Sequence, residues 1–144
     1  MREVVVKIAI ETAPKNVISA FTDPVMLNDW WSVEKIFIEK KQGGIYTLSW
    51  KVSEHGLGYV STGIIKNYDP NSELVIHDFI YLSTEKPFLG PMTLTIRAKE
   101  KNGATEVYLC QAGYQKGKDW NWYYDAVKEA WPNVMLTLKN YLEK

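Results

Sequence analysis

The stretch DWNWYYDAVKEAWPNVMLTLKNYL, residues 119–142, decides the fold that the sequence predicts. Its large apolar residues recur at steps of three or four, which is typical of an amphipathic helix. A helix of about 24 residues is about 36 Å long, and Asp119 is the expected cap. Pro132 cannot donate to the carbonyl of Lys128, so we expect a kink or break there. The apolar stripe consists of Trp120, Tyr124, Val127, Trp131, Met135, Leu138 and Leu142, widened by Tyr123, Val134 and Tyr141.

Upstream of this helix, apolar and polar residues alternate with a period of two, which predicts β-strands. Two short helices interrupt the pattern after the first strand; they begin at Pro14 and Pro24, and Asp23 caps the second. Residues 82–91 hold two prolines and a glycine and are expected to form a loop. The expected strands are residues 3–11, 36–38, 46–50, 58–68, 74–81, 92–98 and 105–109.

Tight turns join most of these strands, so neighbouring strands should pair antiparallel. Such turns are expected at Gly43-Gly44, at 69–72 and at Asn102-Gly103, where both residues tolerate positive φ. A sheet with one apolar face needs a cover, and the long helix has the matching stripe. The prediction is an α+β fold with about six or seven strands. We expect residues 1–144 to form one domain.

The order of these segments resembles that of a known family. The chain is similar to the helix-grip fold of the START and birch-pollen-allergen superfamily (SRPBCC), and most similar to the branch named for the activator of the heat-shock-protein-90 ATPase. The resemblance covers nearly the whole chain in order. Its segments are Ala13-Pro14 with Val17 and Phe21, Thr22-Asp23-Pro24 leading to Trp30-Trp31, Gly43-Gly44, Gly63-Ile64-Ile65 leading to Asp69-Pro70 and Leu74, Gly103-x-Thr105-x-Val107-x-Leu109, and Trp131 with Leu138 and Tyr141-Leu142.

This resemblance implies a curved antiparallel sheet that curls around the C-terminal helix and leaves an apolar cavity between them. Functions in the superfamily include lipid carriage, polyketide cyclisation and chaperone stimulation, so the fold does not fix the function. Two departures matter. Ala130 stands where the family often has glycine, and Pro132 interrupts the closing helix. Both should change how the helix lies on the sheet, and therefore the size of the cavity.

Composition excludes several classes of protein. The 17 Lys and Arg residues balance 17 Asp and Glu residues, whereas a nucleic-acid-binding protein needs an excess of positive charge. One cysteine cannot form an internal disulfide, which favours a cytoplasmic protein. No apolar run reaches the ~18 residues of a membrane span. The N-terminus also lacks the long apolar segment of a signal peptide.

The sequence contains no recognisable catalytic set. His55 lies in a loop, and His77 precedes Asp78 on a strand, where neighbours point to opposite faces and cannot form a local pair. Clustered metal ligands are missing, so we expect no metal and no cofactor. Cys110 has no visible base beside it and is better explained as a small buried residue.

Asp78 shares its strand face, by parity, with the aliphatic Leu74, Ile76 and Ile80. If that face points inward, a carboxylate enters the cavity and must be paired, protonated or used as an anchor for a polar ligand group. If Val75, His77, Phe79 and Tyr81 face inward instead, or if Asp78 lies at the end of the strand, its carboxylate is exposed to water. The sequence favours the second alternative.

Aromatic residues make up 13% of the chain, including six Trp and nine Tyr. Each Trp and each Tyr joins a flat apolar ring to one hydrogen-bonding group, which suits the binding of an amphipathic molecule. The alternative is that they fill the core. Trp122, in a run of aromatics that cannot share one helix face, should face solvent at a cavity entrance or a protein contact. The candidate ligand-binding residues are Trp31, Tyr46, Trp50, Asp78, Tyr124, Trp131 and Met135.

The sequence is consistent with three functions. The leading hypothesis is noncatalytic binding of a small apolar or amphipathic molecule, including a lipid, by a monomer or homodimer. The second is an enzyme of the cyclase or hydrolase type, which would use Asp78 or tyrosine hydroxyls in the same cavity. The third, implied by the resemblance alone, is interaction with a chaperone partner.

Overall fold

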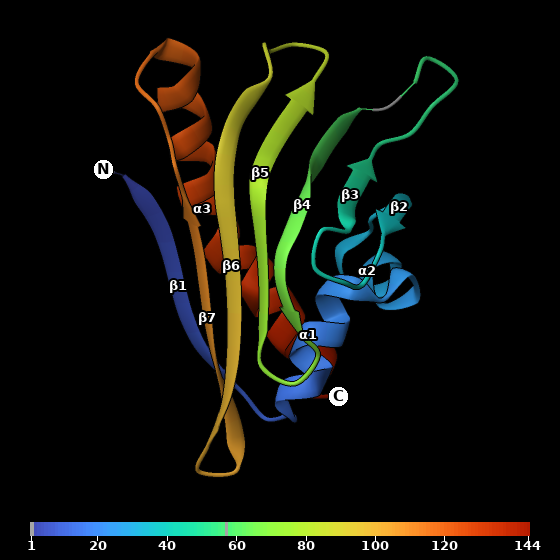
Figure 1. The fold of residues 1–144 in the computed structure, drawn as a ribbon, viewed down its shortest axis with the longest axis vertical. Helices are drawn as coiled ribbons and strands as arrows, with labels where there is room; N and C mark the ends of the chain where they lie inside the picture. Colours follow the sequence, from blue (N-terminus) through green and yellow to red (C-terminus); the bar gives the residue numbers. More distant parts are fainter. Residues whose placement is uncertain (1, 57) are drawn as a thin grey trace.

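The computed structural model of the chain describes residues 2–56 and 58–144. In these residues, seven strands form one antiparallel sheet in the order β1-β7-β6-β5-β4-β3-β2 and three helices accompany it. Helix α3 runs along one face of the sheet (Figure 1). The elements are β1 (Glu3–Ile10), α1 (Pro14–Thr22), α2 (Pro24–Trp31), β2 (Lys35–Ile38), β3 (Ile45–Trp50), β4 (Tyr59–Asp69), β5 (Glu73–Ser83), β6 (Leu89–Lys101), β7 (Ala104–Ala112) and α3 (Lys118–Leu142).

This arrangement confirms the predicted α+β fold, with its two short helices and its long C-terminal helix. Asp23 caps α2 as expected, because its Oδ1 accepts hydrogen bonds from the backbone N–H groups of Val25 and Met26 at 2.9 and 3.4 Å. The predicted loop over residues 82–91 is too long, since β5 continues to Ser83 and β6 begins at Leu89.

Helix α3 differs from its prediction at two points. The N-cap is Gly117, so Asp119 lies in the first turn and is not the cap. The helix also continues through Pro132 without the expected break. Pro132 and Lys128 both lie on the exposed side of the helix, where water can reach the carbonyl that Pro132 cannot pair with. Buried residues on either side of it, Trp131 and Met135, hold the two halves of α3 against the core.

The core lies between the sheet and the three helices. Its fully buried side chains come from α1, from the inner face of the central strands and from α3, for example Phe21, Ile76, Ile96, Leu109 and Leu138. Trp122 is 43% exposed, as predicted, and the Lys86 ammonium lies 4.6 Å from its ring centre. None of the helices within residues 2–56 and 58–144 has the length and apolar composition needed to cross a membrane.

An irregularity in β5 changes which side chains face the core. Leu74 and Ile76 are fully buried, but the pairing of β5 with β6 shifts between Ile76 and Phe79. Asp78 takes a φ of 50° inside this shift. A bulge of this kind inserts an extra residue and reverses the alternation that follows it. Phe79 is therefore buried, as are Leu74 and Ile76 before the bulge, so neither of the two strand faces that parity defines points inward along the whole of β5.

The same bulge overturns a second expectation. His77 and Asp78 do not point to opposite faces, because the strand is irregular at Asp78, and His77 Nδ1 lies 3.4 Å from Asp78 Oδ2. Both side chains are substantially exposed. Opposite the bulge lies Gly63 of β4, where the pairing of β4 with β5 also shifts. The two irregularities face each other across one strand pair and bend the sheet there.

The close contact at Gly63 generates a prediction. A Cβ atom at this position would lie 2.6 Å from Ile76 Cγ2 and 2.9 Å from the His77 carbonyl oxygen. We expect Gly63→Ala to lower the free energy of unfolding by about 1–3 kcal/mol through overpacking, measured by urea denaturation. The control Lys66→Ala changes an exposed position on the same strand and should stay within about 0.5 kcal/mol of the parent. Equal stability of the two variants would contradict the assigned contact.

Candidate functional site

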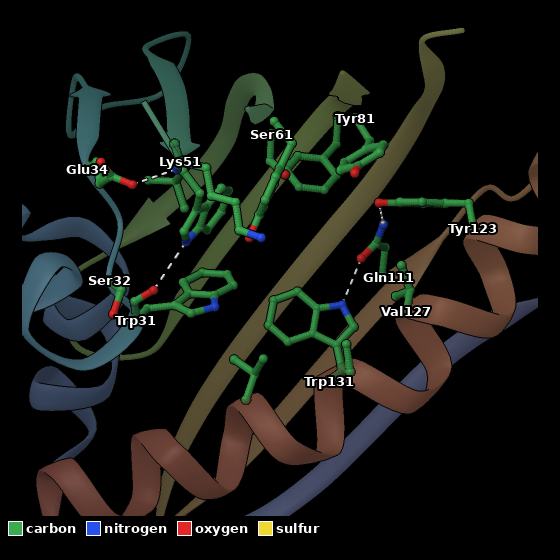
Figure 2. Close-up of a pocket in the computed structure, with 16 residues that line it drawn as sticks. Trp31, Ser32, Glu34, Lys51, Ser61, Tyr81, Gln111, Tyr123, Val127 and Trp131 are labelled. Atoms are coloured by element: carbon green, nitrogen blue, oxygen red, sulfur yellow. Dashed lines mark hydrogen bonds between the residues drawn. The ribbon is translucent and has the colours of Figure 1, made fainter. Parts of the chain in front are cut away.

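A pocket of about 440 Å³ lies between α3 and the curved sheet. We call it the site pocket. Its walls come from α2, from strands β3, β4, β5 and β7, and from α3 (Figure 2). Most of the lining is aromatic or aliphatic, with a few polar groups. The lining residues are Trp31, Ser32, Glu34, Leu48, Trp50, Lys51, Tyr59, Ser61, Phe79, Tyr81, Gln111, Tyr123, Val127, Ala130, Trp131 and Val134.

Aromatic rings make a continuous wall around the site pocket. The centre of the Trp31 ring lies 5.1 Å from that of Trp50 and 5.5 Å from that of Trp131. Trp50 in turn stacks on Tyr59, with their planes 17° apart. The indole N–H of Trp50 donates to the Trp31 carbonyl oxygen at 3.2 Å. These contacts join α2, the sheet and α3 through side chains that also border the pocket.

One polar network stands in this apolar wall. Gln111 is 1% exposed, and its Oε1 accepts the indole N–H of Trp131 at 2.8 Å. Because an indole nitrogen only donates, this contact fixes which end of the amide is oxygen. The amide nitrogen then donates to the Tyr123 hydroxyl at 2.9 Å (Figure 2). The network ties β7 to two successive parts of α3.

The Tyr123 hydroxyl adds a donor to the inner wall. It accepts from Gln111, and within residues 2–56 and 58–144 no acceptor takes its own proton. Burial raises the pKa of the Tyr123 hydroxyl above its ordinary value, because a charged phenolate loses its hydration there. Tyr123 therefore keeps its proton at neutral pH and presents an O–H donor. A protonated Tyr123 hydroxyl can donate a hydrogen bond to a ligand, but it cannot act as a base that removes a proton from one.

Charged groups occur on the side of the site pocket opposite Gln111 and Tyr123 (Figure 2). Glu34 and Lys51 are the charged members of the lining. The Lys51 backbone N–H donates to the Glu34 Oε2 atom at 2.6 Å. Lys51 has a φ of 55° and Ser32 a φ of 58°, values that non-glycine residues seldom adopt. At Ser32 this conformation ends α2 as its C-cap.

Three of the predicted ligand-binding residues meet in the site pocket: Trp31, Trp50 and Trp131. Two others, Tyr46 and Met135, are buried but do not line the pocket. Tyr46 is 1% exposed and its hydroxyl donates to the Phe21 carbonyl oxygen at 2.7 Å, so it is a core residue. Met135 has no exposed surface and does not line the pocket.

Tyr124 and Asp78 also lie outside the site pocket. Tyr124 packs its ring against Tyr114, and the Arg2 guanidinium sits 4.7 Å from its ring centre. The Asp78 side chain is 62% exposed, because the bulge turns it away from the core. The carboxylate of Asp78 therefore meets water, although Leu74 and Ile76, which share its face by parity, are buried.

Several lining residues were missed from the sequence. Phe79 and Tyr81 reach the pocket only because the bulge reverses the strand alternation. Gln111 carried a readable signal: it follows Val107 and Leu109 at the same parity, so its amide had to face the apolar side of β7. A buried amide needs partners, and this requirement could have directed attention to the indole and hydroxyl groups of α3.

The chain is similar to known proteins over almost its whole length. It matches the family described as "Activator of Hsp90 ATPase homolog 1-like protein" over residues 11–143. Among solved structures, the protein MLL2253 from Mesorhizobium loti has a TM-score of 0.75 at 23% identity, over 96% of this chain and 95% of that chain. The Aha1 dimer from Colwellia psychrerythraea has a TM-score of 0.74 at 16% identity, over 99% and 97%.

A third similar structure is DynU16, a protein in the dynemicin biosynthetic locus. Its TM-score is 0.72 at 16% identity, over 99% of this chain and 47% of that chain. No curated protein matches the chain. At these identities the structural likeness establishes a common fold, as the resemblance read from the sequence implied.

The Gln111 network generates a stability prediction. Gln111→Leu leaves the buried indole N–H of Trp131 without its acceptor, which should lower the free energy of unfolding by about 1–3 kcal/mol. Urea denaturation followed by tryptophan fluorescence measures this loss. The control Gln115→Leu alters an exposed glutamine and should change stability by less than about 0.5 kcal/mol. A Gln111→Leu protein as stable as the control would show that the network contributes nothing.

Proposed function

We propose that this chain, which belongs to the family of activator of Hsp90 ATPase homolog 1-like proteins, binds a small apolar or amphipathic molecule in the site pocket without catalysing a reaction. One observation carries the proposal: a pocket of about 440 Å³ walled by aromatic rings with few polar groups. Pockets of this size and lining are typical of small-molecule sites. In this proposal residues 1–144 act as one cytoplasmic binding unit, and the pocket lining is drawn from positions between Trp31 and Val134.

The polar groups fit binding better than catalysis. The Gln111 amide is engaged by Trp131, Tyr123 and the Met92 sulfur, and a side-chain amide does not act as a base at neutral pH. Asp78, the acid–base candidate for an enzyme, lies outside the pocket with an exposed side chain. The pKa values of the Tyr59 and Tyr81 hydroxyls are raised, mainly by burial, so these groups stay protonated at neutral pH. They can hold an acceptor group of a ligand.

Chaperone contact is a second candidate, favoured by the family description. Binding of purified heat-shock protein 90 to the immobilised chain tests it, and the Trp122→Ala variant serves as a probe because Trp122 is an exposed aromatic on α3. Retention of the chaperone would support this role, and no retention would eliminate it.

The chain offers a matched pair of variants that tests small-molecule binding. Ala126 and Ala130 are both exposed and stand one turn apart on α3, but only Ala130 lines the site pocket. The neutral fluorescent probe N-phenyl-1-naphthylamine should bind the parent protein. Ala130→Trp fills the pocket and should weaken binding by about tenfold, or about 1.4 kcal/mol, in a fluorescence titration. Ala126→Trp should match the parent.

Two results would contradict the proposal. One is the absence of probe binding to the parent protein. The other is equal weakening by Ala126→Trp and Ala130→Trp, since that would place the probe on the outer surface of α3. Thermal denaturation of both variants checks that each remains folded.

A further inference from the structure

We infer that the site pocket selects an anionic amphipathic molecule of the aromatic-acid type, with its acidic group paired to Lys51 and its rings against the tryptophan wall. This inference rests on the proposed function, because it names the class of molecule that the same pocket takes. Three observations carry it: the position of the Lys51 ammonium, the lack of an ion-pair partner for it among the residues that the structure describes, and the backbone conformation that holds it there.

The first observation is the direction of the Lys51 side chain. Lys51 follows the last residue of β3 and lines the site pocket. Figure 2 shows its side chain extending over the pocket, with the ammonium group at the open space beside the Trp31 ring. The carboxylate of Glu34 lies on the other side of the Lys51 backbone in the same view. An incoming molecule therefore meets the Lys51 ammonium group, whereas the Glu34 carboxylate accepts the Lys51 backbone N–H.

The second observation is that residues 2–56 and 58–144 give this ammonium group neither an ion-pair partner nor a ring to stack on. In the part of the chain that the structure describes, no carboxylate forms an ion pair with Lys51. Nor does the Lys51 ammonium stack on a ring there, although Arg2, Lys86 and Lys128 each do so elsewhere. Glu34 is engaged through the backbone N–H of Lys51. The charge on the side chain is thus available to a ligand.

The third observation is that the Lys51 backbone is fixed in an uncommon conformation. Its φ of 55° is in the left-handed region, which costs energy for a residue with a Cβ atom. Glu34 holds it from one side, through the hydrogen bond to its N–H. On the other side Gly58 packs so closely that a Cβ atom there would lie 2.6 Å from Lys51 Cβ. Strained backbone of this kind is concentrated at functional sites.

These observations define the ligand. An acidic group beside Lys51 gains a charge-assisted hydrogen bond, and the apolar rings nearby screen this attraction less than water does. Flat apolar rings attached to that group can lie against Trp31, Trp50 and Trp131. A neutral molecule of the same shape gains only the ring contacts, and a cation is repelled by Lys51. We therefore expect the pocket to bind the anion most tightly, the neutral molecule less tightly and the cation least tightly.

Two probes with the same ring skeleton test this selection. 1-Anilinonaphthalene-8-sulfonate carries a sulfonate, and N-phenyl-1-naphthylamine lacks it. The readout is the ratio of the two dissociation constants. A general change in the pocket alters both constants by a similar factor, so the ratio stays the same. We expect the parent to bind the sulfonate more tightly, and Lys51→Met to reduce this preference by about three- to tenfold. Added salt should reduce the preference of the parent in the same direction.

Two further variants complete the test. Lys51→Arg keeps the positive charge and should keep the preference for the sulfonate, which separates charge from packing. Lys66→Met removes a lysine that does not line the pocket and should leave the ratio of the parent unchanged. Lys51→Arg also keeps the test informative if the methionine variant does not fold, because loss of the preference in a folded arginine variant would overturn the inference.

The outcomes separate this inference from the proposed function. If the neutral probe binds and Ala130→Trp weakens it, but Lys51→Met leaves the ratio unchanged, the anionic preference is wrong and the binding function stands. If Lys66→Met lowers the ratio as much as Lys51→Met, the sulfonate binds the general surface and the inference is also wrong. If neither probe enters the pocket, the proposed function itself fails.

Discussion

The hydrogen bonds of the Gln111 amide are the interaction on which the site depends. A glutamine that is almost completely buried in an apolar layer is costly unless its groups are paired. Its partners, Trp131 and Tyr123, both come from α3. The requirement that the amide be paired therefore fixes where α3 lies along the sheet. With α3 held there, the rings of Trp31, Trp50 and Trp131 stand around a pocket that none of them fills.

Curvature of the sheet supplies the other side of the pocket. The bulge at Asp78 and the shift at Gly63 face each other across β4 and β5, and they bend the sheet where the pocket lies. The same bulge brings Phe79 and Tyr81 to the inner face. One backbone irregularity thus shapes the wall and decides which side chains cover it. A regular β5 would place Asp78 on the inner face and remove two rings from the pocket.

Much of the fold could be predicted from the sequence, because its signals are local. Alternation located the strands, Pro14 and Pro24 located the short helices, and the stripe of residues 119–142 gave α3. The site was harder, since it depends on tertiary packing. Trp31, Trp50 and Trp131 were found as large amphipathic side chains, but burial alone does not separate a pocket wall from the core, which is why Tyr46 and Met135 were included with them. The bulge at Asp78 has no local signal in the sequence, because an aspartate tolerates both regular and left-handed backbone.

In the proposed function, an amphipathic molecule lies between α3 and the sheet. Intermolecular nuclear Overhauser effects between N-phenyl-1-naphthylamine and protein methyl groups measure this directly. Val127 and Val134 line the site pocket, whereas Leu136 is 52% exposed on α3 and does not. We expect strong effects to the methyl groups of Val127 and Val134 and none to those of Leu136. Effects to Leu136 alone, or to no methyl group of the pocket, would contradict the proposed function.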